Sequence, residues 1–274
     1  MVMSALHSGR GPAVFRDLAV GLVLQGLFSA ATWGLLDLPA TYMGVSAGLY
    51  LLLAILLAIL LLRRHPERVG GLGPGLGTAN RVTFGRSLLV LPVMALVPFG
   101  WRLSSTGHWW IILVATAAMS LDALDGRVAR RTGTESRFGA RFDMELDAFL
   151  LLGLSVLVWG SGMVGWWVIL VGGLRYLFVA AGWIWPVLRG DLPESVRRKT
   201  VCVVQGVVLL VCLGPIIPSW FATAVAAGAL ALLGYSFAVD VRWLVFDGSA
   251  ARCESATRLS APSTGSPGAG SCDH

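Results

Sequence analysis

Eight long apolar segments run through this chain of 274 residues and restrict it to folds that sit in a membrane. Each is close to the roughly 17–25 residues that a helix needs to cross the hydrocarbon core of a bilayer. The segments are predicted at 18–36, 42–62, 87–103, 108–124, 148–165, 166–187, 200–217 and 219–246. Lipid offers no water to backbone groups, so such segments satisfy them internally as helices. We therefore predict an all-α fold, a polytopic bundle of transmembrane helices.

Basic residues gather in three of the connecting segments, and this asymmetry predicts the orientation of the bundle. They are Arg63, Arg64, Arg68, Arg81 and Arg86, then Arg127, Arg130, Arg131, Arg137 and Arg141, then Arg189, Arg197, Arg198 and Lys199. The opposite loops hold only Arg102. We expect the basic segments and both termini on the cytoplasmic side of the cell membrane. The net charge of +6 then reflects topology and attraction to anionic lipids, and not nucleic-acid binding.

Four aspartates stand at the facing ends of two neighbouring apolar segments. Asp122 and Asp125 are three residues apart, and Asp143 and Asp147 are four apart. On α-helices each pair shares one face. Four like charges beside a membrane core repel one another unless cations join them. All-oxygen ligands suit Mg²⁺ or Mn²⁺, so the pattern predicts a site for two divalent ions.

Three residues too small to block these acidic faces accompany the aspartates: Gly126, Ala129 and Gly139. Together with the aspartates and Arg130 they read D-x2-D-G-x2-A-R-x8-G-x3-D-x3-D without a mismatch. That pattern resembles the signature of the CDP-alcohol phosphotransferase family, also called CDP-alcohol phosphatidyltransferases. The resemblance covers roughly residues 78–247 and implies a core of six transmembrane helices.

The resemblance also implies a reaction. An alcohol attacks the β-phosphate of a CDP-linked lipid such as CDP-diacylglycerol, and CMP leaves, as a step of phospholipid biosynthesis. The expected partners are this lipid, a small alcohol acceptor and membrane lipids. Asp122, Asp125, Asp143 and Asp147 would bind two Mg²⁺ or Mn²⁺ ions. Asp147 would also act as the general base that takes the proton of the acceptor.

Nucleotide contacts are implied from two regions. Asn80, Thr83 and Arg86 form an N-x2-T-x2-R pattern along one helical face, with Ala79 where the family usually has proline. Gly126, Ala129, Arg130 and Gly139 complete the nucleotide-binding residues that the resemblance implies. The structural alternative for the first group is a helix N-cap at Asn80 and an Arg86 whose charged end reaches the membrane surface.

Arg175 is an isolated charge inside the sixth apolar segment. An arginine at membrane depth is costly and usually faces a polar cavity, and Gly172 and Gly173 permit close helix approach beside it. The resemblance implies an acceptor-phosphate site formed by Arg175, Arg137 and Arg198. We therefore expect a phosphorylated polyol, glycerol 3-phosphate or inositol phosphate. The alternatives are an amino-alcohol or uncharged acceptor, with Arg175 paired to an aspartate or to helix carbonyls.

The chain divides into four parts by composition. They are an N-terminal helix pair at 1–64, a Gly- and Pro-rich linker at 65–78, the transferase domain at 79–248 and a disordered tail at 249–274. The helix pair carries Asp17 near its start and almost nothing else polar at membrane depth. We expect it to serve packing or an oligomer contact, which leaves a homodimer open.

Two other functions stay open at this stage. An aspartate-lined cation transporter would account for eight spans and buried carboxylates, but not for the positions of the glycines, the alanine and the arginine. A non-catalytic relative kept for assembly would not need an intact motif. Metal-dependent release of CMP from CDP-diacylglycerol separates the enzyme from both.

Overall fold

The computed structural model describes residues 10–63, 78–132, 137–185 and 196–260. Within these ranges all regular structure is helical, as predicted. The α-helices are α2 (Arg10–Leu36), α3 (Thr41–Arg63), α4 (Thr78–Met94), α5 (Ser105–Thr132), α6 (Arg137–Gly160), α7 (Ile169–Ile184), α8 (Val196–Cys212) and α9 (Ser219–Ser260). Two 3₁₀ helices, η2 (Val97–Arg102) and η3 (Trp166–Val168), lie in the connections. Each predicted apolar segment overlaps one α-helix, but the segment at 87–103 continues past the end of α4 at Met94 into η2.

Four helices of the described part are long and apolar enough to cross a membrane. These spans are Val14–Leu36, Thr41–Ile59, Trp166–Ile184 and Ser219–Leu244. Helix α4 is apolar but shorter, whereas α5 and α6 are as long but carry the charges of the aspartate motif. The predicted fold, a helical bundle of an integral membrane protein, is confirmed.

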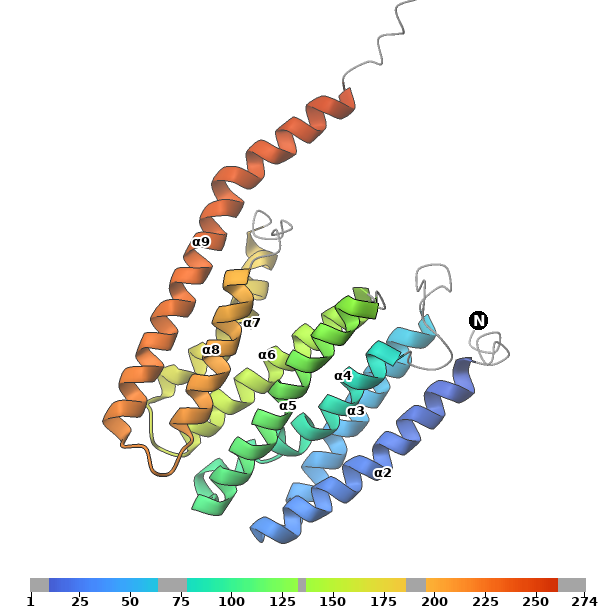
Figure 1. Ribbon diagram of the computed structural model, residues 1–274, viewed down its shortest axis with the longest axis vertical. Coiled ribbons are helices and arrows are strands. Elements are labelled where there is room, and N and C mark those ends of the chain that lie inside the picture. The colour runs from blue at the N-terminus through green and yellow to red at the C-terminus, as the bar shows by residue number, and fades with distance from the viewer. Residues whose placement is uncertain (1–9, 64–77, 133–136, 186–195, 261–274) are drawn as a thin grey trace, which may run out of the picture.

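Helix α6 is the central element of the bundle. It packs against α4, α7 and α8, and Figure 1 shows it between the N-terminal and C-terminal helices. Leu150, Leu154 and Leu157 lie on its buried side and are almost completely enclosed. Side chains of this size dominate core packing. The aspartates of α6 are therefore carried by a helix that the core encloses along one side.

Helices α6 and α7 approach closely at one glycine. A Cβ atom at Gly172 would overlap the backbone of Leu151 and Leu152, so no larger residue fits without moving a helix. The predicted role is confirmed for Gly172, whereas a Cβ at Gly173 would meet only the end of the Leu152 side chain, at 4.0 Å. This contact brings α7, and with it Arg175, alongside α6.

A buried polar seam ties the N-terminal helices to each other and to α5. Gln25 Nε2 donates to Ser46 Oγ at 3.1 Å, the hydroxyls of Ser29 and Ser46 lie 2.7 Å apart, and Trp110 Nε1 donates to Thr32 Oγ1 at 3.2 Å. The expectation of almost nothing polar in this pair was wrong. The polar residues of α2 recur at helical spacing and share one face, which the surrounding apolar residues conceal in the sequence.

Helix α4 lies between this N-terminal pair and the rest of the bundle. Phe84, Leu88 and Leu91 recur along one of its faces and pack against residues of α2 and α3, among them Tyr50. Arg86 stands two residues from Phe84 and so points the other way, toward α5 and α6. The N-terminal pair thus supports the helix that presents Arg86 to the bundle.

The C-terminal end departs from expectation. The disordered tail was predicted from residue 249, but α9 continues to Ser260 and extends past the other helices in Figure 1. That prediction was wrong for 249–260, where Ala, Arg, Glu and Leu favour helix. Residues 64–77 and 261–274 lie outside the described part, so the division of the chain at its linker stays a prediction.

Candidate active site

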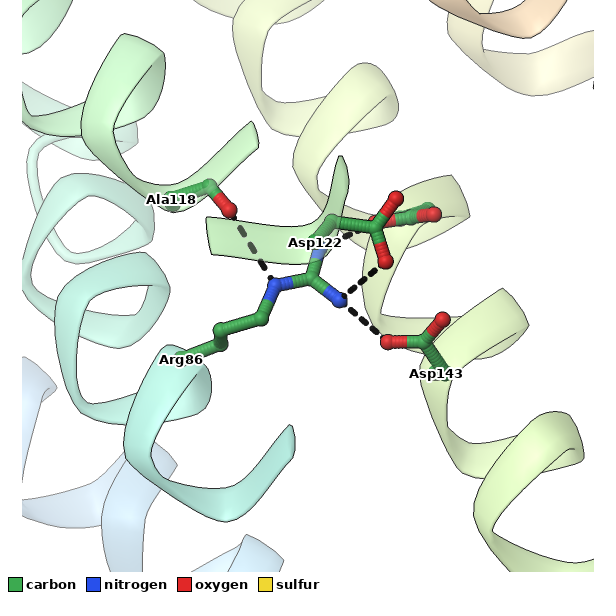
Figure 2. Close-up of polar contacts among 5 residues, drawn as sticks. Arg86, Ala118, Asp122 and Asp143 are labelled. Carbon is green, nitrogen blue, oxygen red and sulfur yellow. Dashed lines mark hydrogen bonds and ion pairs between the residues drawn. The ribbon is translucent and has the colours of Figure 1, made fainter. Parts of the chain in front are cut away.

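Three aspartates from two helices meet around one arginine, and Figure 2 shows two of them, Asp122 and Asp143, beside Arg86. Asp122 comes from α5, and Asp143 and Asp147 come from consecutive turns of α6. Arg86 Nη1 donates to Oδ1 of Asp122 at 2.8 Å and also to Oδ1 of Asp143. Its Nη2 donates to Oδ1 of Asp147 at 2.6 Å. Three of the four predicted aspartates therefore lie together in the fold.

The arginine lies deeper than the carboxylates that it contacts. Its side chain is only 2% exposed, whereas those of the three aspartates are between 29% and 36% exposed. Arg86 thus forms the inner wall of the cluster, and the carboxylates keep a side that other groups can reach.

The cluster has the chemistry of a divalent-cation site. One carboxylate oxygen from each aspartate can be chosen so that all three lie within 4.8 Å of one another. The donors are all oxygen, which suits Mg²⁺ or Mn²⁺. Three carboxylates also outnumber the single guanidinium, so added cations would balance the remaining charge. Asp125, the fourth predicted ligand, lies on α5 where the structure does not describe side chains.

A cavity of about 300 Å³ adjoins two of the aspartates. It lies between α5, α6 and α8, and Asp122 and Asp147 supply its acidic groups. Most of the lining is apolar, from Met119, Leu150, Leu151, Val203, Val207 and Leu210, with Thr116, Ser120 and Cys202 between them. A site with carboxylates beside an apolar cavity suits a ligand that is charged at one end and apolar at the other.

Residues 76–239 match the family model described as CDP-alcohol phosphatidyltransferase. This chain belongs to that family. The match includes both helices of the aspartate cluster and the helix that carries Arg86, while α2 and α3 lie outside it.

Two mycobacterial relatives give the family more detail. The chain is 33% identical over 162 residues to a Mycobacterium tuberculosis protein with the provisional name phosphatidylglycerophosphate synthase. The aligned residues make up 57% of this chain and 74% of the relative. It is 29% identical over 96 residues to another from that organism, provisionally named cardiolipin synthase, which covers 34% of this chain and 46% of the relative. The chain thus spans about half the length of this second relative. No solved structure gives a significant match.

The residues expected at the nucleotide are placed in part. Thr83 is buried on α4 and Gly139 is buried on α6. Arg86 lies in the aspartate cluster, so the alternative of a side chain reaching the membrane surface was wrong. The structure does not describe the side chains of Asn80, Ala129 and Arg130 or the surroundings of Gly126.

The residues expected at the acceptor contact different helices. Arg175 Nη2 donates to Glu145 Oε1 of α6 at 2.5 Å, and its Nε is buried without a hydrogen-bond partner. Arg198 Nη1 lies 3.6 Å from Asp240 Oδ1 of α9. The side chain of Arg137 is outside the described part. Among the contacts described, then, Arg175 is tied to α6 and Arg198 to α9.

Sequence reasoning missed two acidic partners. One is Glu145, which contacts Arg175. The other is Asp240, which accepts a hydrogen bond from Arg197 Nη2, while Arg197 Nη1 donates to the backbone oxygen of Ser236 at 2.6 Å and to its hydroxyl at 3.0 Å. A signal existed for Asp240, since a lone carboxylate in an apolar helix requires a cationic partner.

Proposed function

We propose that this chain transfers the phosphatidyl group of a CDP-linked lipid, such as CDP-diacylglycerol, to an alcohol and releases CMP, as a step of phospholipid biosynthesis. The observation that supports this best is the meeting of Asp122, Asp143 and Asp147 beside an apolar cavity, in a member of the CDP-alcohol phosphatidyltransferase family. A diphosphate needs positive charge, which cations held by the carboxylates would supply. The lipid part of the substrate needs an apolar surface next to that site.

The metal ligands in this proposal are Asp122, Asp125, Asp143 and Asp147, for two Mg²⁺ or Mn²⁺ ions. When bound, such ions would neutralise the diphosphate and stabilise the charge that develops on the departing CMP. The protein contributes the fixed separation of the carboxylates, because α5 and α6 are both held by the core.

We also assign Asp147 the role of general base. It lies one turn beyond Asp143 and lines the cavity together with Asp122. A base must come within about 2.6–3.2 Å of the proton that it removes. Because Arg86 donates to Oδ1 of Asp147, we assign the acceptor's proton to its other oxygen, Oδ2.

The lipid and the acceptor would enter from different sides. Val203 and Val207 of α8 lie in the apolar lining of the cavity and would contact an acyl chain or the glycerol backbone. The acceptor would enter from the cytoplasm, the side on which the basic residues of the connections predict the aspartates. Labelling from outside intact cells of a cysteine introduced into residues 127–141 would contradict this orientation.

For the acceptor we propose a phosphorylated polyol, with glycerol 3-phosphate first. The provisional name of the relative at 33% identity, phosphatidylglycerophosphate synthase, favours it over inositol phosphate. Arg175 supports a phosphate as well. Its Nε is buried without a partner, and its Nη2 is held by a partly exposed Glu145 that an anion could displace.

The test is CMP release by the purified protein in lipid nanodiscs. CDP-diacylglycerol and Mg²⁺ are supplied with glycerol 3-phosphate, inositol phosphate, glycerol or an amino alcohol. We expect metal-dependent release with glycerol 3-phosphate, and loss of release in Asp122→Asn.

The matched control is Asp37→Asn. Asp37 lies in the turn between α2 and α3 beside Ser104, just ahead of α5, which begins 17 residues before Asp122. Its φ of 48° is left-handed, a conformation that asparagine tolerates, so this variant should keep full activity. If no acceptor yields CMP and Asp122-dependent cation flux is seen instead, the transporter replaces the enzyme as the proposed function.

A further inference from the structure

Arg86 joins three helices through one guanidinium group. Its Nε donates to the backbone oxygen of Ala118 on α5 at 3.1 Å, as Figure 2 shows. Its two terminal nitrogens donate to Asp122, Asp143 and Asp147. A guanidinium is planar and rigid, so the bond to Ala118 sets the direction of the remaining donors. The arginine therefore contacts the aspartates from a fixed position.

The contacts of Arg86 use one oxygen of each carboxylate. In all three cases the acceptor is Oδ1. A carboxylate has two oxygens and can accept from a donor with one while it ligates a cation with the other. Ligating carboxylates in metal sites are commonly held in this way by a hydrogen bond from a neighbouring group.

Arg86 is also poorly placed to contact a nucleotide. Its side chain is 2% exposed, and the far face of α4 is packed through Phe84 and Leu88 against the N-terminal helices. Reaching a ligand would require α4 to separate from α5 or α6. The aspartates are about one third exposed and are therefore more accessible to a ligand than the arginine.

We propose that Arg86 is a positioning residue of the metal site: it holds one oxygen of each of three aspartates, so that the other oxygens of Asp122 and Asp143 are presented to the cations and Oδ2 of Asp147 is presented to the acceptor beside them. The proposal rests on the metal role of the aspartates given above. It differs from that role in naming the group that orients the ligands, and it removes Arg86 from the nucleotide-binding residues.

A rival explanation predicts the opposite change in metal affinity when Arg86 is replaced. If the guanidinium occupies the place of a cation, it must leave before metal binds, and removing it would strengthen metal binding. If it positions the carboxylates, removing it lets three like charges move apart, and metal binding weakens. Lysine is the informative replacement because it keeps the charge but cannot serve four acceptors from a planar fork.

The experiment measures binding of Mn²⁺ alone to the purified protein, from the electron paramagnetic resonance signal of the free ion. We expect Arg86→Lys to weaken Mn²⁺ binding by about 10–100-fold, the range for partners of metal ligands. The matched control is Arg197→Lys, which alters another arginine with several partners and should leave Mn²⁺ binding unchanged. Arg86→Gln replaces Arg86→Lys if the latter does not fold.

A kinetic readout separates positioning from nucleotide contact. At saturating Mn²⁺, Arg86→Lys should regain much of its CMP release, with the KM for CDP-diacylglycerol unchanged. Unchanged or tighter Mn²⁺ binding in this variant overturns the proposal, as does a raised KM that Mn²⁺ does not correct. If the wild-type protein shows no Asp122-dependent Mn²⁺ binding, both this proposal and the metal site fail. If the wild-type protein binds Mn²⁺ through Asp122 and Arg86→Lys binds it equally well, the metal site stands and only the proposed role of Arg86 fails.

Discussion

Two arginine–carboxylate clusters in the described part of this protein have opposite charge balance. Around Arg86, one guanidinium meets three carboxylates, and those carboxylates stay about one third exposed. Around Asp240, one buried carboxylate meets Arg197 and, at 3.6 Å, Arg198. Ser236 supplies a carbonyl and a hydroxyl to Arg197. The first cluster has more carboxylates than guanidinium groups, whereas the single carboxylate of the second contacts two arginines.

This difference separates a site from a structural contact. Buried charges occur in both clusters, so burial alone does not identify function. What distinguishes the Arg86 cluster is an excess of partly exposed oxygen ligands beside a cavity. What distinguishes the Asp240 cluster is a carboxylate enclosed between α8 and α9. We therefore expect changes at the first to alter activity and changes at the second to alter stability.

The largest effect is expected for Asp122→Asn. Loss of a metal ligand removes several kcal/mol of transition-state stabilisation, so CMP release should fall by about a thousand-fold or more. Asparagine has nearly the same volume, so the thermal unfolding midpoint should change little. Normal activity of this variant at low Mg²⁺ would rule out the metal assignment.

A somewhat smaller loss is expected for Asp147→Asn. If Asp147 is the base, CMP release should fall by about 10²–10⁴-fold, while Mn²⁺ and CDP-diacylglycerol still bind. The check compares turnover with Mn²⁺ binding, measured by electron paramagnetic resonance, and with CDP-diacylglycerol binding, measured by lipid competition. Should binding and turnover fall together, Asp147 is a metal ligand first and the base lies elsewhere.

The opposite pattern is expected for Asp240→Asn. Removing this charge leaves the donors of Arg197 without their anionic partner at the α8–α9 contact and should destabilise the fold by about 1–3 kcal/mol. Arg197 is partly exposed, which keeps the effect below that of a fully buried pair. Unfolding in denaturant measures it, and activity per folded molecule should be unchanged. A selective loss of activity would contradict the division between the two clusters.

The smallest effect concerns Arg175, whose pair with Glu145 has one charge of each sign. Arg175→Ala should raise the KM for glycerol 3-phosphate by about tenfold, the worth of one charge-assisted hydrogen bond, with little change for CDP-diacylglycerol. Arg175→Lys should recover part of this loss. If Arg175→Ala lowers only the folded yield, Arg175 is structural and the acceptor is an uncharged alcohol or an amino alcohol.

Much of this molecule could be predicted without its structure. Apolar length decides that the chain forms helices in a membrane, because the bilayer leaves backbone groups no other partner there. The aspartates at spacings of three and four must share a helix face, whatever surrounds them. Both conclusions rest on local geometry, which is why helix order and the shared face of Asp143 and Asp147 agree with prediction. The helical continuation of 249–260 was missed because composition was given more weight than helix propensity.

Only the tertiary structure could decide which charges meet. Arg86 lies 36 residues from Asp122 and 61 from Asp147, and Arg197 lies 43 from Asp240. No periodicity links positions that far apart, because such pairs depend on which helices pack together and at what rotation. The sequence by itself determined a membrane helix bundle with two acidic faces. Packing of α4 against α5 and α6 decided that these faces share one arginine, since side-chain contacts between helices depend on the whole core and not on any one segment.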